Sequence, residues 1–137
     1  MLGFSQSEIG RRIGVSRQAV YNALNTALRK VELALKHVAD ANKIEIRYID
    51  PTNGILLGFS PSTNNRVIIT FSVKHGIHVW HYENPDCSRC KFVNKCRKIL
   101  FDEAKERNIT LSPEERKLPP SKLAHLIFSR VIPGLEP

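Results

Sequence analysis

The apolar residues change their spacing near residue 42, and this change constrains the fold more than any other feature of the chain. Before it, apolar side chains recur every three or four residues, as on one face of an α-helix: Val20, Leu24, Leu28, Val31, Leu35 and Val38. After it, apolar and polar residues alternate, as in 44–48 and 67–73, which is typical of half-buried strands. The chain therefore combines helices with strands.

The middle of the chain, residues 43–83, predicts four strands joined by short turns. Turn-forming residues lie at 50–54 and 60–65, and His75-Gly76 is typical of a tight hairpin connection, with His75 exposed at its tip. Four strands with such short links indicate an antiparallel β-meander. Helical patterns follow at 93–107, from Ser112, and at 122–132.

The first 25 residues predict two short-linked helices. Ser5-Gln6-Ser7-Glu8 is a capping-box pattern, and Ser16 is a second N-cap candidate. Helices that cross steeply need a small residue at the contact, which Gly10 supplies. The turn between them needs a residue that tolerates positive φ, which Gly14 supplies. The pattern therefore indicates a helix-turn-helix whose second helix starts at Ser16.

The second of these helices is long, because its apolar stripe continues to Val38. Two uses of that stripe are open. It is either a dimer seam or the face by which the helix packs on the next part of the chain.

The outward residues of this second helix suit nucleic acid. In a helix-turn-helix, the early residues of the second helix meet base edges in the major groove. Arginine and glutamine suit guanine and adenine edges, and serine and asparagine suit bases or phosphates. We expect Arg11 and Arg12 to hold the phosphate backbone. The expected base-reading set is Ser16, Arg17, Gln18, Tyr21, Asn22 and Asn25.

The stretch SQSEIGRRIGVSRQAVYNAL resembles the helix-turn-helix DNA-binding transcription regulators, of the sigma-region-4-like type and the archaeal Tfx type. The resemblance implies DNA binding, with Arg17, Gln18, Tyr21 and Asn22 facing the bases. Those domains carry a further helix before the motif, whereas four residues precede Ser5 here. We expect the long helix or a partner chain to supply the missing packing, or the true start to lie upstream. The alternative is a helical hairpin for protein contact.

The net charge is +8, from 21 Lys and Arg against 13 Asp and Glu. The basic excess lies at the two ends, in residues 1–41 and 87–137, whereas residues 42–86 are balanced. Such clustering suits a polyanion such as nucleic acid, or a solvated basic surface.

Three cysteines, Cys87, Cys90 and Cys96, lie within ten residues in the spacing C-x2-C-x5-C. An odd, tightly spaced set makes a poor disulfide framework and indicates a metal or cluster site. Cys96 lies at a predicted helix start, where backbone amides favour the thiolate. Five basic neighbours are suited to offset the charge of an anionic cluster.

The cysteine spacing resembles the iron–sulfur loops of endonuclease III-like glycosylases and of CRISPR-associated RecB-like nucleases, which implies a [4Fe-4S] cluster. The chain departs from both in having no fourth cysteine, and the carboxylate–lysine core of those nucleases is not evident. Three cysteines and one histidine also form a structural Zn²⁺ set. His81 is then the candidate fourth ligand, with His78 nearby. Cluster, zinc and no metal all stay open.

The sequence carries no Gly-rich phosphate loop, nucleophile elbow or paired acidic motif, so we do not expect an enzyme. It has no apolar run of the ~20 residues that crossing a bilayer needs, and no secretory signal is visible. We therefore expect a cytoplasmic protein without a membrane role.

Together these features predict an α+β fold: a helix-turn-helix with a long helix in residues 1–41, then a β-meander, a metal-binding loop and helices in residues 42–137. The leading hypothesis is a homodimeric, sequence-specific transcription regulator that binds double-stranded DNA and responds to redox state or iron through an iron–sulfur cluster. The alternative is a zinc-stabilised nucleic-acid-binding component of a larger RNA-processing or defence complex.

Overall fold

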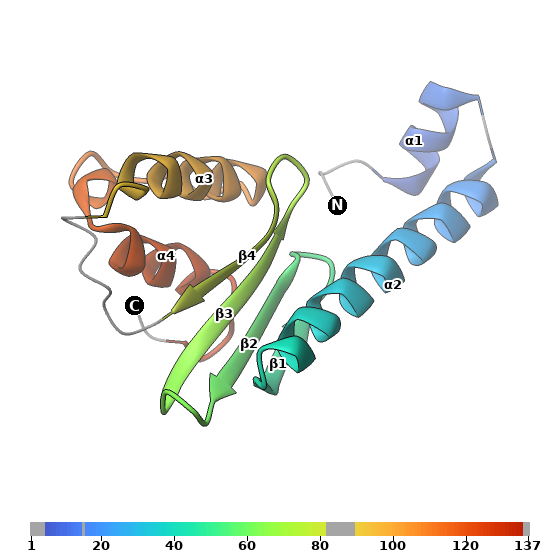
Figure 1. Ribbon diagram of the computed structural model, residues 1–137. Coiled ribbons are helices and arrows are strands. Elements are labelled where there is room, and N and C mark those ends of the chain that lie inside the picture. The colour runs from blue at the N-terminus through green and yellow to red at the C-terminus, as the bar shows by residue number, and fades with distance from the viewer. Residues whose placement is uncertain (1–4, 15, 82–89, 136–137) are drawn as a thin grey trace.

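The computed structural model describes residues 5–14, 16–81 and 90–135. Within them the chain forms helices at both ends and one sheet between them (Figure 1). This confirms the predicted α+β class. In chain order the elements are α1 (Gln6–Ile13), α2 (Arg17–Ala41), β1 (Glu45–Asp50), β2 (Ile55–Ser60), β3 (Asn65–Ser72), β4 (Gly76–His81), α3 (Val93–Glu106), the 3₁₀ helix η2 (Glu115–Lys117) and α4 (Pro120–Ser129).

The four strands form one antiparallel sheet in the order β1-β2-β3-β4, so the predicted meander is confirmed. The register of β1 against β2 shifts between Ile46 and Tyr48, which is a bulge in an edge strand. Gly58 lies opposite Ile46. A Cβ at Gly58 would sit 2.3 Å from the Ile44 side chain and 2.9 Å from the Glu45 carbonyl oxygen. The close approach of these two segments therefore requires glycine.

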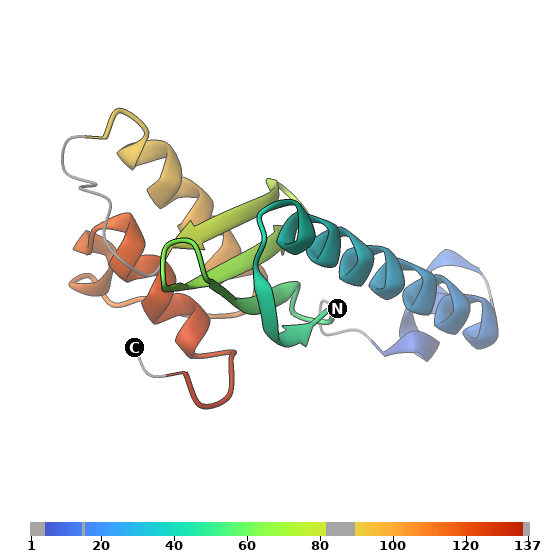
Figure 2. The same ribbon diagram turned by 60° about the horizontal axis from the view of Figure 1, so that its bottom comes forward.

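Helices cover both faces of the sheet. Successive residues of a strand point to opposite faces, and four consecutive residues of β3, Val67–Thr70, are buried. Val67 and Ile69 belong to one apolar cluster with α2, whereas Ile68 belongs to another with α3 and α4. Figures 1 and 2 show the resulting three layers, with α2 on one face and α3 and α4 on the other.

The long helix α2 packs on the sheet with its C-terminal half only. Val31, Leu35 and Ala39 are buried in the cluster on that face. The N-terminal half extends beyond the sheet to α1 (Figure 1), where Val20 is buried. Of the two uses predicted for the apolar stripe, packing on the next part of the chain is therefore confirmed.

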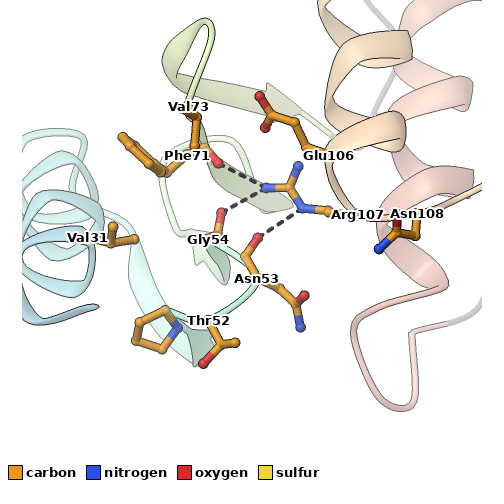
Figure 3. Close-up of a pocket in the computed structure, with 10 residues that line it drawn as sticks. Val31, Thr52, Asn53, Gly54, Phe71, Val73, Glu106, Arg107 and Asn108 are labelled. Atoms are coloured by element: carbon orange, nitrogen blue, oxygen red, sulfur yellow. Dashed lines mark hydrogen bonds between the residues drawn. The ribbon is translucent and has the colours of Figure 1, made fainter. Parts of the chain in front are cut away.

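A buried arginine joins the end of α3 to the sheet. Arg107, whose side chain is 4% exposed, donates to the carbonyl oxygens of Asn53 at 2.9 Å, Gly54 at 3.3 Å and Phe71 at 3.1 Å (Figure 3). It also donates to the carbonyl of Glu103 at 3.1 Å. One side chain thus satisfies backbone acceptors of the β1–β2 turn, β3 and α3.

Glu103 lies one turn before Arg107, and its side chain is fully buried against the sheet. Its Oε1 is 3.7 Å from Nη1 of Arg107, and neither carboxyl oxygen accepts a hydrogen bond of normal geometry from the described residues. Burial raises the pKa of Glu103 to about 7 from an ordinary value of 4.5, although Thr70 and Arg107 act in the opposite direction.

The expectation that His75 is exposed at the hairpin tip is wrong. Its side chain is half-buried, and Nε2 lies 2.7 Å from Oδ2 of Asp102 on α3. The hydrogen bond to His75, with a contribution from Lys74, lowers the pKa of Asp102. The β3–β4 hairpin folds against α3 instead of standing free in solvent.

The two C-terminal helices differ from the predicted spans. From Ser112 the chain forms a complete capping box with Glu115, at 2.8 and 3.2 Å, but the helix is a single 3₁₀ turn. The last helix begins at Pro120 and ends at Ser129, earlier than predicted. Proline suits the first helical turn because the missing N–H has no partner there.

We predict that Glu103 makes the protein less stable as the pH rises from about 4.5 to about 7. In this window the folded state keeps a proton that the unfolded chain has lost. The free energy of unfolding therefore decreases with pH, by up to about 3 kcal/mol. Glu103→Gln holds a neutral side chain of the same size and should remove this slope.

Urea unfolding across this pH range measures the effect, with Glu114→Gln as the control because Glu114 is exposed. The control should keep the wild-type slope. An equally steep slope in Glu103→Gln would contradict the assignment.

Candidate nucleic-acid interface and cysteine site

Two serine caps and one glycine set the path of the chain from α1 into α2. Oγ of Ser5 accepts from the Glu8 amide at 3.1 Å, and Oγ of Ser16 accepts from the Ala19 amide at 3.1 Å. Both predicted N-caps are therefore confirmed. Gly14 has φ +72°, which glycine adopts without steric cost. Gly14 and the Ser16 cap thus set the backbone at the end of α1 and at the start of α2.

The side chains expected to read bases line the free end of α2. Ser16, Arg17, Gln18 and Asn22 are exposed, and Asn25 is half-buried. The expected base-reading residues of α2, which are Arg17, Gln18, Tyr21, Asn22 and Asn25, are spaced so that they share one side of the helix. Tyr21 is 46% exposed, which is high for an aromatic side chain of this size.

The first helix also contributes to this surface. Gln6 of α1 lies with Arg17, Gln18 and Tyr21 around a shallow hollow. Within α2, Nε2 of Gln18 donates to Oδ1 of Asn22 at 3.2 Å. Gln6 was not predicted for this surface, because its only signal in the sequence is its place at the start of a helix.

Two arginines of α1 are expected to contact the DNA phosphate backbone, and the structure describes the side chain of one of them. Arg11 is exposed on α1, as a phosphate contact requires. The side chain of Arg12 lies outside the described part of the structure.

The free end of α2 carries positive charge that no acidic residue in its first turns offsets. Residues 16–31 contain Arg17, Arg29 and Lys30 and no Asp or Glu, and the first turn of α2 has no acid. The N-terminus of a helix itself carries partial positive charge and unpaired N–H groups. Both features favour the approach of a phosphate group.

Two of the three cysteines lie in the described residues, next to and within the start of α3. Cys90 is exposed, and its Sγ accepts from the backbone amide of Phe92 at 3.4 Å. Cys96 is half-buried in α3. Cys87 lies outside the described residues. Hydrogen bonds to the cysteine sulfurs are among the contacts that surround iron–sulfur clusters, and the sulfur of Cys90 has one.

The structure places His81 and Cys96 in different layers. His81 is exposed at the end of β4 and pairs with Val67, so it shares the sheet face that α2 covers. Cys96 lies on α3, on the other face. Among the described residues, no group of three potential ligands is arranged to hold a metal.

His78 lies on the α3 side of the sheet instead. Its ring stacks on Trp80 with the centroids 5.7 Å apart, and its Nε2 is 3.2 Å from the carbonyl oxygen of His75. Trp80 in turn donates from Nε1 to the Thr70 hydroxyl at 2.9 Å. These contacts give His78 a structural role in the edge of the sheet.

A cleft of about 410 Å³ lies between α2, the β1–β2 turn, β3 and the end of α3 (Figure 3). Its apolar wall includes Val31 and Phe71. Its two charged residues both bond to the chain itself: Arg107 to carbonyl groups, and Glu106 to the Ser72 hydroxyl at 3.0 Å. The cleft thus offers apolar surface beside α2, and its charged groups are used by the fold.

Comparison with known protein families, curated proteins and solved structures found no match to this chain. In the described part of the structure, no helix has both the length and the apolar composition that spanning a bilayer requires.

Proposed function

We propose that this protein is a sequence-specific transcription regulator that reads the major groove of double-stranded DNA with the first turns of α2. The observation that carries the proposal is the row of polar side chains from Arg17 to Asn25, at an end of α2 that extends beyond the sheet (Figure 1). A protruding helix end enters a groove about 12 Å wide, whereas a helix packed along its whole length does not. In this proposal, exposed Arg11 on α1 holds the DNA phosphate backbone.

The alternative use of α1 and α2, as a hairpin for protein contact, fits this surface less well. The centre of a protein interface is depleted of charge and rich in buried apolar anchors. Here Arg17, Gln18 and Asn22 are polar and exposed, and their donors and acceptors match those of base edges.

Arg17→Ala should reduce discrimination at one base position by about 1–3 kcal/mol, because one side chain reads one base pair. Selection from a random duplex library, followed by affinity measurements on single-base variants, tests this. Arg47→Ala is the matched control, because Arg47 is an exposed arginine that belongs to β1 of the sheet and not to α1 or α2. It should leave the selected sequence unchanged.

A loss for Arg17→Ala that is equal on all duplexes would make Arg17 a phosphate contact and overturn the base-reading role. A wild-type preference for RNA or single strands would favour the alternative function, a nucleic-acid-binding component of an RNA-processing or defence complex.

We further propose that the regulator is a homodimer that binds a palindrome, with Leu33 in the contact between copies. Leu33 is 56% exposed on α2. It lies two residues before the buried Leu35 and hence on the opposite side of the helix, away from the sheet. An exposed leucine on a helix fixed by its other face is suited to contact a second copy.

Leu33→Glu should convert the dimer to a monomer without unfolding the chain, since the site is exposed. Light scattering gives the mass, and circular dichroism checks the fold. Val73→Glu is the control, because Val73 is also exposed, at 70%, but lies on the β3–β4 hairpin. A wild-type protein that is monomeric at micromolar concentration would contradict the dimer.

We also propose that Cys87, Cys90 and Cys96 hold a [4Fe-4S] cluster, with Zn²⁺ as the alternative. The amide donor to Cys90 supports this fit, as does exposed Lys91 beside the loop, whose charge offsets that of thiolates. When bound, a cluster supplies sensitivity to oxygen or iron, whereas zinc would fix the loop to α3. Because Cys96 belongs to α3, a change at this site reaches α2 through the sheet.

Protein purified without oxygen should contain iron with matching sulfide, and Cys90→Ala and Cys96→Ala should each lose both. His81→Ala tests whether His81 is the fourth ligand, and its iron content is compared with that of His37→Ala, because His37 is an exposed histidine on α2. DNA affinity with and without air then tests the response. Zinc without sulfide would assign a structural role to the cysteines. A wild-type protein with neither metal would contradict the site.

A further inference from the structure

A row of lysines runs along the outer face of α3. Lys95, Lys98 and Lys105 are all exposed. They lie three and seven residues apart, which places them on one side of the helix. The opposite side carries the buried residues of α3, which pack on the sheet and α4: Ile99, Leu100, Glu103 and Ala104.

The acidic residues of α3 do not offset this row, because each is engaged elsewhere. Asp102 bonds to His75 at 2.7 Å and pairs with Lys74 at 3.4 Å. Glu106 accepts from the Ser72 hydroxyl at 3.0 Å and from the Lys74 amide at 3.2 Å. Glu103 is buried beside the sheet.

Helix α2 shows the contrasting arrangement, since Lys36 pairs with Glu32 one turn away at 3.2 Å. Lys95 and Lys98 are three residues apart, and like charges at this spacing destabilise a helix. Asp102 lies between Lys98 and Lys105 on the same side of α3, but it is paired with His75 and Lys74. The lysines are therefore suited to bind an external anion.

The row is remote from the end of α2 that is proposed to read bases. Figures 1 and 2 both show α1 and the free end of α2 at one end of the molecule and the first turn of α3 at the other. From Lys95 to Lys105 the row is about 15 Å long, and one DNA strand carries one phosphate for about every 3.4 Å of helix axis. The row can therefore face several consecutive phosphates, outside the segment that α2 contacts.

We propose that the outer face of α3 is a second DNA-binding surface, which binds the phosphate backbone of duplex DNA outside the segment read by α2. This backbone is the flank of the same site, and a separate duplex molecule is the alternative that the test distinguishes. The surface carries no base specificity and adds affinity that depends on salt. Its position relative to a read segment rests on the proposed function of α2, whereas its binding of phosphates does not.

The test compares two triple variants with the same change in charge. Lys95→Gln/Lys98→Gln/Lys105→Gln removes the row, and Lys43→Gln/Lys117→Gln/Lys122→Gln removes three exposed lysines elsewhere. Glutamine keeps a long side chain and good helix propensity. Three duplex arms are measured over a range of salt: the selected site alone, the site with long flanks, and capture of a second labelled duplex by protein bound to an immobilised site.

Both variants should bind the short site equally. On the flanked duplex, the row variant should lose at least about tenfold in affinity at low salt, and its salt slope should fall by about 3. The control should match wild type. A loss in the capture arm alone would assign a separate duplex and overturn the flank. Row and control variants that behave alike in both arms would overturn the proposal.

Failure of the two proposals is distinguishable. If wild type selects no sequence, the proposed function is wrong. The affinities of the row and control variants are then measured on an arbitrary duplex, where the row variant must still bind more weakly than the control. If wild type selects a sequence but the row variant matches the control in every arm, only the second surface falls. If wild type binds no duplex, both fall.

Discussion

Both faces of strand β3 are buried, and the arrangement of the other elements follows from this constraint. Antiparallel sheets commonly leave one face to water. Here four consecutive residues, Val67–Thr70, are buried, so a helical layer must cover each side. Burying an apolar side chain such as Ile69 or Phe128 is worth about 1.5–3 kcal/mol. The C-terminal half of α2 supplies one layer. The N-terminal half of α2 extends away from the sheet.

The other face of the sheet is more polar, and its contacts show how the layers are coupled. Thr70 and Ser72 are fully buried there, and each hydroxyl has a partner, Trp80 for the first and Glu106 for the second. Arg107 adds bonds from the end of α3 to the β1–β2 turn and to β3. Buried polar groups are costly when a partner is lost. A displacement of α3 would break several such bonds, so α3 and the sheet move together.

Local patterns made much of this fold predictable, and long-range contacts limited the rest. The apolar spacing of α2, the alternation in β3 and the serine caps act over a few residues, so the sequence alone was sufficient to place them. His75 and Asp102 are 27 residues apart, and Arg107 and Asn53 are 54 apart; such pairs leave no periodic signal. At the candidate interface, the α2 residues followed from helical spacing, whereas Gln6 joins them only through the turn between the helices.

The length of α2 gives a physical reason why small changes where it packs on the sheet would affect the proposed DNA reading. No Gly or Pro lies between residues 17 and 41, so the helix has no residue of the kind that usually causes a kink. From Leu35, which is anchored on the sheet, to Arg17 the rise is about 27 Å. A tilt of about 5° at the anchor then moves Arg17 by about 2 Å, which exceeds the few tenths of an ångström over which a hydrogen bond keeps its geometry. If α2 reads bases as proposed, a small tilt of the helix at its anchor would be enlarged at the bases without a hinge in the helix.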